Sequence, residues 1–242
     1  PVAVLLRGVW MEARYGGPDG LGGLPWARFA GWAATSLQLA LLAAAAAVAL
    51  ALLLGFLLRS RAGGGVAPLA RLVSLGYAVP GAVIAVGLLG PLGWVQAAAP
   101  GSAAAGWATL LLTGSVGGLL YAYLVRFAAV ALQSVEAGYA RIPASFDDTA
   151  RTLGAGAGRL FFGVHAPLLT RAALAAGLLV FVDVMKELPA TLVLRPFGSD
   201  TLAVVAYNLA RDERLAEAAL PSLAIVIVGL IPVVLLSRAM RG

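Results

Sequence analysis

Three charged residues stand inside one of the apolar stretches of this chain. Asp183, Lys186 and Glu187 follow one another at positions i, i+3 and i+4, which puts them on one face of a helix. If the stretch crosses a membrane, each charge costs about 2.5–3.5 kcal/mol on insertion scales. We therefore expect the lysine to lie between the two carboxylates and pair with them, and Pro189 to end the helix just beyond. The charged face could line a translocation path or serve as a buried staple between helices, and the sequence leaves both interpretations open.

A polar segment between two apolar stretches, residues 148–167, is the second candidate site. Ser145 and Asp148 have the spacing of a capping box, which predicts the start of a short helix. Gly154 is suited to end that helix, because glycine accepts the left-handed backbone conformation. A second short helix, residues 159–165, should follow. Two short helices with a glycine elbow form a knob that could push on a protein outside the membrane. The alternative is an amphipathic connector on the lipid surface.

Two further expectations concern this segment. Asp147 and Arg151 are four residues apart, so we expect an ion pair of roughly 0.2–0.5 kcal/mol on the helix surface. His165 is the only histidine of the chain. A metal site would need further ligands near it, and none are close in sequence. We therefore expect His165 to meet solvent or a partner protein rather than a metal ion.

The chain contains few residues of the types that catalytic sites require. The chain has no cysteine, and its single lysine, Lys186, follows Met185 and so cannot belong to the Gly-Lys-Ser/Thr motif of a phosphate-binding loop. Neither a Ser-His-Asp arrangement nor a pair of catalytic carboxylates stands out. We expect no enzyme site, cofactor or metal centre, and any ATP must be hydrolysed by another protein.

The composition places the chain in a membrane. Hydrophobic residues make up 61% of the 242 residues and charged residues only 12%, whereas an average soluble domain is about 25% charged. The alternation expected of barrel strands is missing, so we expect helical spans. The net charge of +6 comes from arginines between the apolar runs, which orient spans in a membrane rather than bind nucleic acid. The predicted fold class is an all-α integral membrane protein.

Five apolar stretches are long enough to cross a hydrocarbon core of about 30 Å as helices. Residues 1–30, rich in glycine and proline, are expected to form an extracytoplasmic loop with interfacial aromatic residues. Pro80 and Gly81 should kink the second span, and residues 201–210 should form a surface or half-inserted helix. The predicted spans are 31–58, 66–95, 107–131, 168–194 and 218–236, and the polar segment between the third and fourth covers 139–167.

The distribution of arginine predicts the orientation of these spans. The side that is richer in Arg and Lys is expected to be cytoplasmic. This rule places residues 148–167 and the C-terminus in the cytoplasm and the N-terminus outside. The richer side carries Arg59, Arg61, Arg71, Arg126, Arg141, Arg151, Arg159, Arg171, Arg238 and Arg241, and the other carries Arg7, Arg14, Arg28, Arg195, Arg211 and Arg214.

The spacing of the polar segment resembles a known motif. Asp148-Thr149-Ala150, three residues, Gly154, nine residues and Val164-His165-Ala166-Pro167 are similar to the EAA loop of ABC-transporter permeases. That loop reads Glu-Ala-Ala, three residues, Gly, nine residues, Ile-x-Leu-Pro. Gly154 and Pro167 match it, whereas Asp148, Thr149, Val164 and Ala166 depart from it. In these permeases the loop is a cytoplasmic coupling helix that docks on an ATPase subunit. The resemblance implies that the coupling residues are Asp148, Thr149, Ala150, Gly154, Val164 and Pro167.

Other stretches narrow the family. Residues 76–81, GYAVPG, followed by 85–87, AVG, are similar to a region of binding-protein-dependent permeases. Residues 186–196, KELPATLVLRP, resemble the ferric-iron permeases most closely, and the thiamine and sulfate permeases less so. The resemblance extends over residues 31–242. Members of the ferric-iron family are often one chain with two homologous halves. With one loop and Pro1 at its start, this chain is similar either to a second half or to a half-size subunit.

The resemblance also implies a function. It identifies residues 31–242 as the transmembrane domain of a type I ABC importer of the inner membrane. Such a permease would move ferric iron that an extracytoplasmic binding protein delivers, beside a second permease half and driven by partner ATPase subunits. Thiamine, sulfate, molybdate and polyamine are alternative cargoes. An ion-coupled secondary transporter that uses Asp183, Lys186 and Glu187 as its relay is the alternative from another class.

Overall fold

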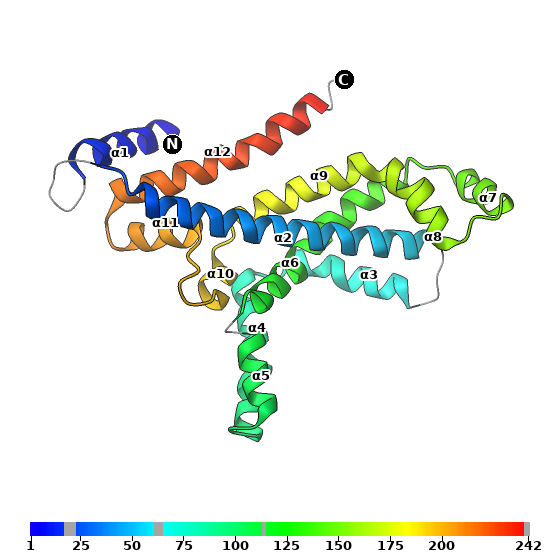
Figure 1. Cartoon of the computed structure of the whole chain (residues 1–242), viewed down its shortest axis with the longest axis horizontal. Helices are drawn as coiled ribbons and strands as arrows, with labels where there is room; N and C mark the ends of the chain where they lie inside the picture. The colour runs from blue at the N-terminus through cyan, green and yellow to red at the C-terminus, as the bar shows by residue number, and fades with distance from the viewer. Residues whose placement is uncertain (17–22, 61–64, 113–114, 240–242) are drawn as a thin grey trace. The chain divides into compact units, whose positions relative to one another are not determined.

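The chain is helical in a computed structural model (Figure 1). The structure describes the backbone of residues 1–16, 23–60, 65–112 and 115–239, and the side chains of these residues up to 231 together with Val234. No strand occurs within these ranges. The chain divides into two compact units, which are described separately. Unit 1 comprises Pro1–Leu41, Gly81–Ala122 and Val182–Gly242, and unit 2 comprises Leu42–Pro80 and Tyr123–Phe181.

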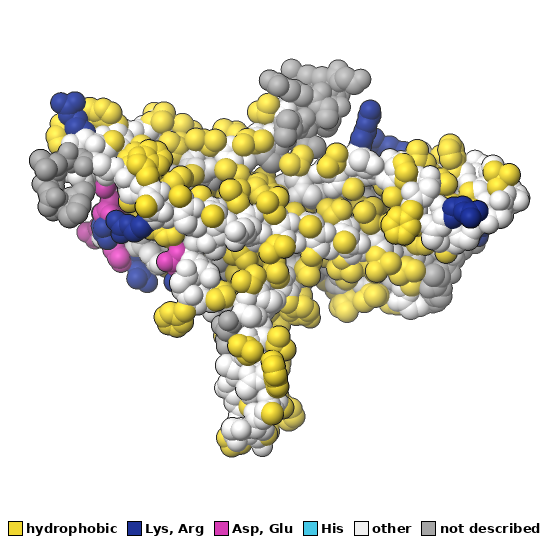
Figure 2. All heavy atoms as spheres, in the orientation of Figure 1, with side chains coloured by type: hydrophobic (Ala, Val, Ile, Leu, Met, Phe, Trp, Pro, Cys, Tyr) yellow, Lys and Arg dark blue, Asp and Glu magenta, His cyan; other side chains and the backbone are white. Residues whose placement is uncertain are grey.

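Four helices among the described residues are long and apolar enough to cross a membrane, so the protein is a multi-pass membrane protein by its length and composition. The longest, α2, has 34 residues and would extend about 51 Å. Between Arg28 and Arg59 it contains no charged residue. Figure 2 shows hydrophobic side chains exposed along the helices, as expected of a surface that faces lipid. The four helices are Trp26–Arg59 (α2), Gly81–Ala98 (α4), Val116–Tyr139 (α6) and the continuous Ala157–Met185.

The first predicted span, 31–58, lies within α2, which is a single helix over these residues. The second, 66–95, is wrong as a single helix. It consists of α3 (Val66–Leu75), a 3-10 turn η1 (Gly76–Ala78) and α4, which begins at Gly81. Pro80 explains the break, since the residue before a proline is driven towards extended backbone. Val79 has that conformation, with φ −84° and ψ 126°. The expected kink is therefore a complete interruption.

The third predicted span, 107–131, is also wrong as one helix. It covers the end of α5 (Ala103–Leu112) and the first part of α6. Thr113 and Gly114, between the two helices, lie outside the described residues. The Ser115 hydroxyl accepts a hydrogen bond from the Gly117 backbone N–H at 3.1 Å, which marks a new helix start.

The fourth predicted span, 168–194, is wrong at both ends. The helix begins as α8 (Ala157–Leu160), continues through a π turn, η2 (Phe161–His165), and becomes α9 (Ala166–Met185). The predicted short helix 159–165 is therefore the first part of the span. Pro167 does not stop the helix, because the π turn just before it accommodates a residue that cannot donate a backbone hydrogen bond. Residues 189–194 form a separate helix, α10 (Pro189–Leu194).

Unit 1 also contains the remaining helices. Residues 1–30 are not a loop throughout, because Val2–Tyr15 form α1, which packs against α12 (Leu215–Ala239). The fifth predicted span, 218–236, lies within α12. The predicted helix at 201–210 is α11 (Leu202–Arg211). Its start is fixed to α2, since the Leu202 N–H donates to the Ser36 hydroxyl at 2.8 Å.

Candidate functional site

The candidate site is the helical knob of unit 2 that precedes the long helix Ala157–Met185. Its first helix, α7, spans Ser145–Thr152. Gly154 adopts φ +81° and ends it, as predicted. The Gly154 N–H donates to the Arg151 carbonyl and the Ala155 N–H to the Ala150 carbonyl, both at 2.9 Å. This pair of bonds is a Schellman motif, and it satisfies carbonyl groups that the end of a helix leaves free.

The predicted capping box is absent at the start of α7. Ser145 is the first residue of the helix, and Ala144 precedes it with no side-chain cap. The turn after Pro143 explains this outcome. The Phe146 N–H donates to the Pro143 carbonyl and the Asp147 N–H to the Ala144 carbonyl, so the chain is already turning before Ser145. The side chain of Asp148 is left exposed on the helix surface.

Asp147, and not Asp148, anchors the knob. It is 7% exposed, and its Oδ2 lies 2.9 Å from Nε of Arg59, the last residue of α2. Arg59 also donates through Nη2 to Asp147 Oδ1 at 3.4 Å and to the Pro143 carbonyl at 2.9 Å. The expected surface pair of Asp147 with Arg151 is therefore wrong. A fork of guanidinium donors on a buried carboxylate is a stronger arrangement than a solvated pair four residues apart.

His165 joins the same cluster, which corrects the expectation that it meets solvent or a partner. The side chain is fully buried. Its Nε2 lies 3.0 Å from Asp147 Oδ1, and its Nδ1 lies 3.1 Å from the Tyr139 hydroxyl. An ionised carboxylate can only accept, so Nε2 carries a proton and donates to Asp147. The Tyr139 hydroxyl forms the hydrogen bond to Nδ1 at the opposite edge of the ring. Arg59, Asp147, His165 and Tyr139 are called the Asp147 network below.

Close helix packing brings Tyr139 and His165 into position. A Cβ added at Gly55 of α2 would lie 2.9 Å from Val135 of α6, so glycine permits the two helices to approach. One added at Gly138, next to Tyr139, would lie 2.7 Å from Cβ of Ala172 in α9. These contacts bring the ends of the three helices together at the network.

The electrostatics of the network favour an ionised Asp147. Burial by itself would raise the pKa of the Asp147 carboxyl, but the hydrogen bonds from Arg59 and His165 outweigh it and hold the pKa below the usual value. The ring of Phe56 packs edge-on against His165, with centroids 5.4 Å apart, and covers it with apolar surface. Among the residues of the network, sequence reasoning missed Arg59 and Tyr139 and misplaced His165. The apolar neighbours Val164 and Ala166 were a signal that His165 could be buried.

The other side of α7 is apolar and exposed. The side chains of Phe146 and Leu153 are 48% and 80% exposed. They border a hollow of about 370 Å³, and Thr149, Ala150 and Val164 line it with them. Three of the predicted coupling residues, Thr149, Ala150 and Val164, therefore lie together on this surface. We call it the α7 surface, and its lining residues are Ser145, Phe146, Thr149, Ala150, Leu153 and Val164. Of the other three, Asp148 and Pro167 are exposed, and Gly154 ends α7.

The three charges of unit 1 do not share one helix face. α9 ends at Met185, so Lys186 and Glu187 lie in the turn before α10. Lys186 Nζ is 2.9 Å from Asp183 Oδ1, and the lysine side chain is 61% exposed. Glu187 is buried, and its Oε1 accepts a hydrogen bond from the Ala190 N–H at 3.1 Å. Glu187 thus caps α10, which is a task different from the one expected of it.

Neither family models nor curated proteins connect the chain to a known protein. No model of a protein family matches it, and the comparison with curated proteins finds no significant similarity. Within the described residues, no group of three or more His, Cys, Asp or Glu side chains could hold a metal ion. The geometry of the knob and the spacing of its residues are therefore the features from which a function is inferred below.

Proposed function

We propose that this chain is the transmembrane domain of an ABC importer and that α7 is the helix on which an ATPase subunit acts. The observation that carries this proposal is the two-sided character of α7. One side presents the exposed α7 surface, with Phe146 and Leu153, and the other side is fixed by Asp147 to membrane helices. A short helix with an unfilled apolar face and a rigid attachment is suited to receive a partner and transmit its movement.

The attachment favours a mechanical role over a connector that rests on lipid. Burying a charge pair costs several kcal/mol per ion before the attraction between the ions is counted. An amphipathic connector needs no such pair, because lipid headgroups and water solvate its polar face. In this knob, Arg59 of α2 and Tyr139 of α6 converge on α7 and on His165 of the long helix. A force on α7 would therefore reach three candidate membrane spans together.

The partners and the cargo follow from the same proposal. The spacing from Asp148 to Pro167 supports an ATPase subunit as the partner of α7, and the arginine distribution supports the cytoplasm as its location. The resemblance of residues 186–196 favours ferric iron, delivered to the outer face of the inner membrane by a binding protein. A second permease half would complete the pathway, and ATP-driven closure of the ATPases would bring the two knobs together. Thiamine, sulfate, molybdate and polyamine are the competing cargoes.

Site-specific photo-crosslinking tests the partner. A benzoyl-phenylalanine at Phe146 or Leu153, in membranes of cells that express the chain natively, should capture a protein that hydrolyses ATP and contains a phosphate-binding loop. Thr152 is exposed on the same helix but does not line the α7 surface, so a crosslinker there is the matched control. The proposal fails if neither surface position captures an ATPase while the purified chain alone carries cargo down an ion gradient. That result would favour the secondary transporter.

Uptake measurements decide between the proposed cargoes. Cells that lack the chain should lose uptake of radioactive ferric iron and keep uptake of radioactive thiamine and sulfate. Restoring the chain with a plasmid should restore iron uptake. Loss of another cargo instead would contradict the assignment of iron while leaving the ABC importer intact.

A further inference from the structure

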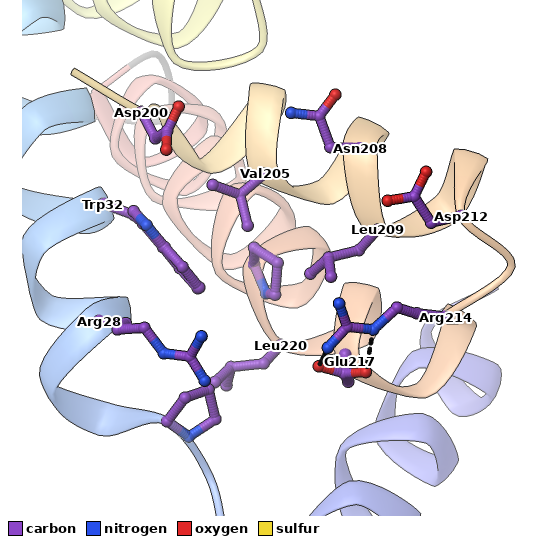
Figure 3. Close-up of a pocket in the computed structure, with 12 residues that line it drawn as sticks. Arg28, Trp32, Asp200, Val205, Asn208, Leu209, Asp212, Arg214, Glu217 and Leu220 are labelled. Atoms are coloured by element: carbon purple, nitrogen blue, oxygen red, sulfur yellow. Dashed lines mark hydrogen bonds and ion pairs between the residues drawn. The ribbon is translucent and has the colours of Figure 1, made fainter. Parts of the chain in front are cut away.

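Unit 1 contains a hollow of about 250 Å³ that is separate from the knob and was not predicted from the sequence. It lies between the first turns of α2, the length of α11 and the first turns of α12. Figure 3 shows Arg28 and Trp32 reaching into it from α2, and Leu209 and Arg214 facing them from the other side. The hollow therefore combines charged groups of both signs with an apolar wall.

The apolar wall is formed mainly by Trp32, Val205, Leu209 and Leu220. Val205 and Leu220 are buried, and Trp32 is partly exposed. An indole face beside aliphatic side chains offers a contact surface for the flat apolar body of a small molecule.

The carboxylates around the hollow already have arginine partners. Asp200 is paired with Arg195, and Glu217 with Arg214 (Figure 3 shows the second pair). Asp212 lies 3.6 Å from Nε of Arg211. Glu12 of α1 interacts with Glu217 and Arg214, and burial and Glu217 together raise its pKa above the usual value. The acidic groups are therefore not free to hold a cationic ligand.

Arg28 differs from these arginines. No carboxylate lies within ion-pair distance of it among the described residues, and the first turn of α2 contains no acidic residue. Its guanidinium is directed into the hollow in Figure 3. An unpaired guanidinium beside an apolar wall matches a carboxylate group attached to an apolar body, because the planar fork of donors binds a carboxylate with two parallel hydrogen bonds.

We propose that this hollow binds a small organic monocarboxylate, with its carboxylate on Arg28 and its apolar body against Trp32 and Leu209. A phosphate or a dicarboxylate fits less well, because Arg214 is already paired with Glu217 and Arg28 alone would balance only one of its two negative charges. This inference stands on unit 1 alone and does not depend on the role of α7.

Ligand-observed fluorine NMR with 4-fluorobenzoate tests the proposal on the purified chain in detergent. We expect the wild type to bind 4-fluorobenzoate saturably. The affinity of Arg28→Gln for the same ligand should be lower by about tenfold or more. Arg28→Lys, which keeps the charge but not the fork, should lie between the two. Arg7→Gln is the matched control, because Arg7 is exposed on α1 of the same unit and does not line the hollow. Each variant is first checked for the wild-type elution volume and melting temperature.

Two further compounds test which chemical class of ligand the hollow binds. The neutral 4-fluorobenzamide should bind weakly to every variant, and inorganic phosphate should not displace 4-fluorobenzoate. Equal binding of the amide would show partition into apolar surface and would overturn the proposal. Displacement by phosphate, or full binding to a well-folded Arg28→Gln variant, would also overturn it.

Discussion

Asp147 accepts a hydrogen bond from Arg59 at 2.9 Å, although 88 positions separate the two residues in the sequence. The first residue belongs to the knob and the second is the last residue of the longest apolar helix. This ion pair attaches the short helix α7 to the end of α2, which is a candidate membrane span. The position of α7 is therefore set by a contact between distant parts of the chain and not by the loop that contains it.

A double-mutant cycle measures this contact. Asp147→Asn leaves the Arg59 guanidinium partly buried without its counter-charge and is expected to lower the free energy of unfolding by about 1–3 kcal/mol. Arg59→Gln should cost a similar amount, and the double variant should cost clearly less than the sum. Denaturant or thermal unfolding in detergent provides the values. Asp148→Asn, at the exposed neighbouring position, should change stability by less than about 0.5 kcal/mol. Additive effects of the two substitutions would show that the pair contributes little.

Acidification should weaken the same contact. The folded-state pKa of Asp147 is lower than its ordinary value of 3.8, so the unfolded chain takes up the proton first as pH falls. The stabilisation is then complete above the ordinary value and is lost as pH falls towards the folded-state pKa. Stability measured from about pH 6 down to pH 3 should fall more steeply in the wild type than in Asp147→Asn. Parallel curves for the two proteins would contradict this assignment.

Gly154 sets the end of α7 through its backbone conformation alone. A Cβ there would meet no atom within 4 Å, but φ is +81°. Gly154→Ala is therefore expected to cost about 1–2 kcal/mol of strain. Under the proposed function it should also reduce the transport obtained for each ATP hydrolysed, because the exit of α7 shifts. Gly158→Ala is the matched control, since Gly158 also has open space around it and lies within α8. Unfolding curves and coupled transport assays of both variants provide the comparison.

Local chemistry made some features predictable. The end of α7 follows from one glycine, and α2 follows from an apolar run that no charged residue interrupts between Arg28 and Arg59. Both depend on neighbours within a few turns, which a sequence displays directly. The break before α4 was expected as a kink, because Pro80 shows where a helix is disturbed but not whether it continues.

Other features depend on contacts that a sequence does not display. The partner of Asp147 is Arg59 rather than the nearby Arg151, and Arg59 is 88 positions away in the sequence, at the end of another helix. His165 is buried because Phe56 and Tyr139 cover it. The span boundaries were misplaced for a related reason. This chain is apolar over most of its length. The spacing of apolar residues is therefore nearly the same in a helix and in the turn that ends it, and it does not show where the helix stops.

The α7 surface should matter more for partner binding than for folding. Leu153 is 80% exposed, so replacing it by serine should change the free energy of unfolding by less than about 0.5 kcal/mol, whereas Phe146 is 48% exposed and its replacement by serine should cost about 1 kcal/mol. A few side chains at the centre of an interface cost more than about 1 kcal/mol of binding when they are removed, and we expect Phe146 and Leu153 to be among them, so recovery of the proposed ATPase subunit should fall several-fold. Thr152→Ser, outside this surface, should leave recovery unchanged. Co-purification from native membranes provides the measurement, and wild-type recovery with both serine variants would remove α7 from the interface.

The turn after α9 offers the sharpest test of whether the charged residues of unit 1 face water. The chain has no cysteine, so a single introduced cysteine can be labelled without background. Lys186 is 61% exposed in its side chain, whereas Glu187 is buried and caps α10. Lys186→Cys should therefore react with a membrane-impermeant thiol reagent, and Glu187→Cys should be protected at least tenfold, since a thiolate reacts only where water and reagent reach it. Labelling is measured by the mass shift of the intact protein, with and without ATP and its partners. If neither Asp183→Cys nor Lys186→Cys reacts in any nucleotide state, the exposed lysine faces lipid or another subunit, and the charged turn holds helices together instead of lining a path.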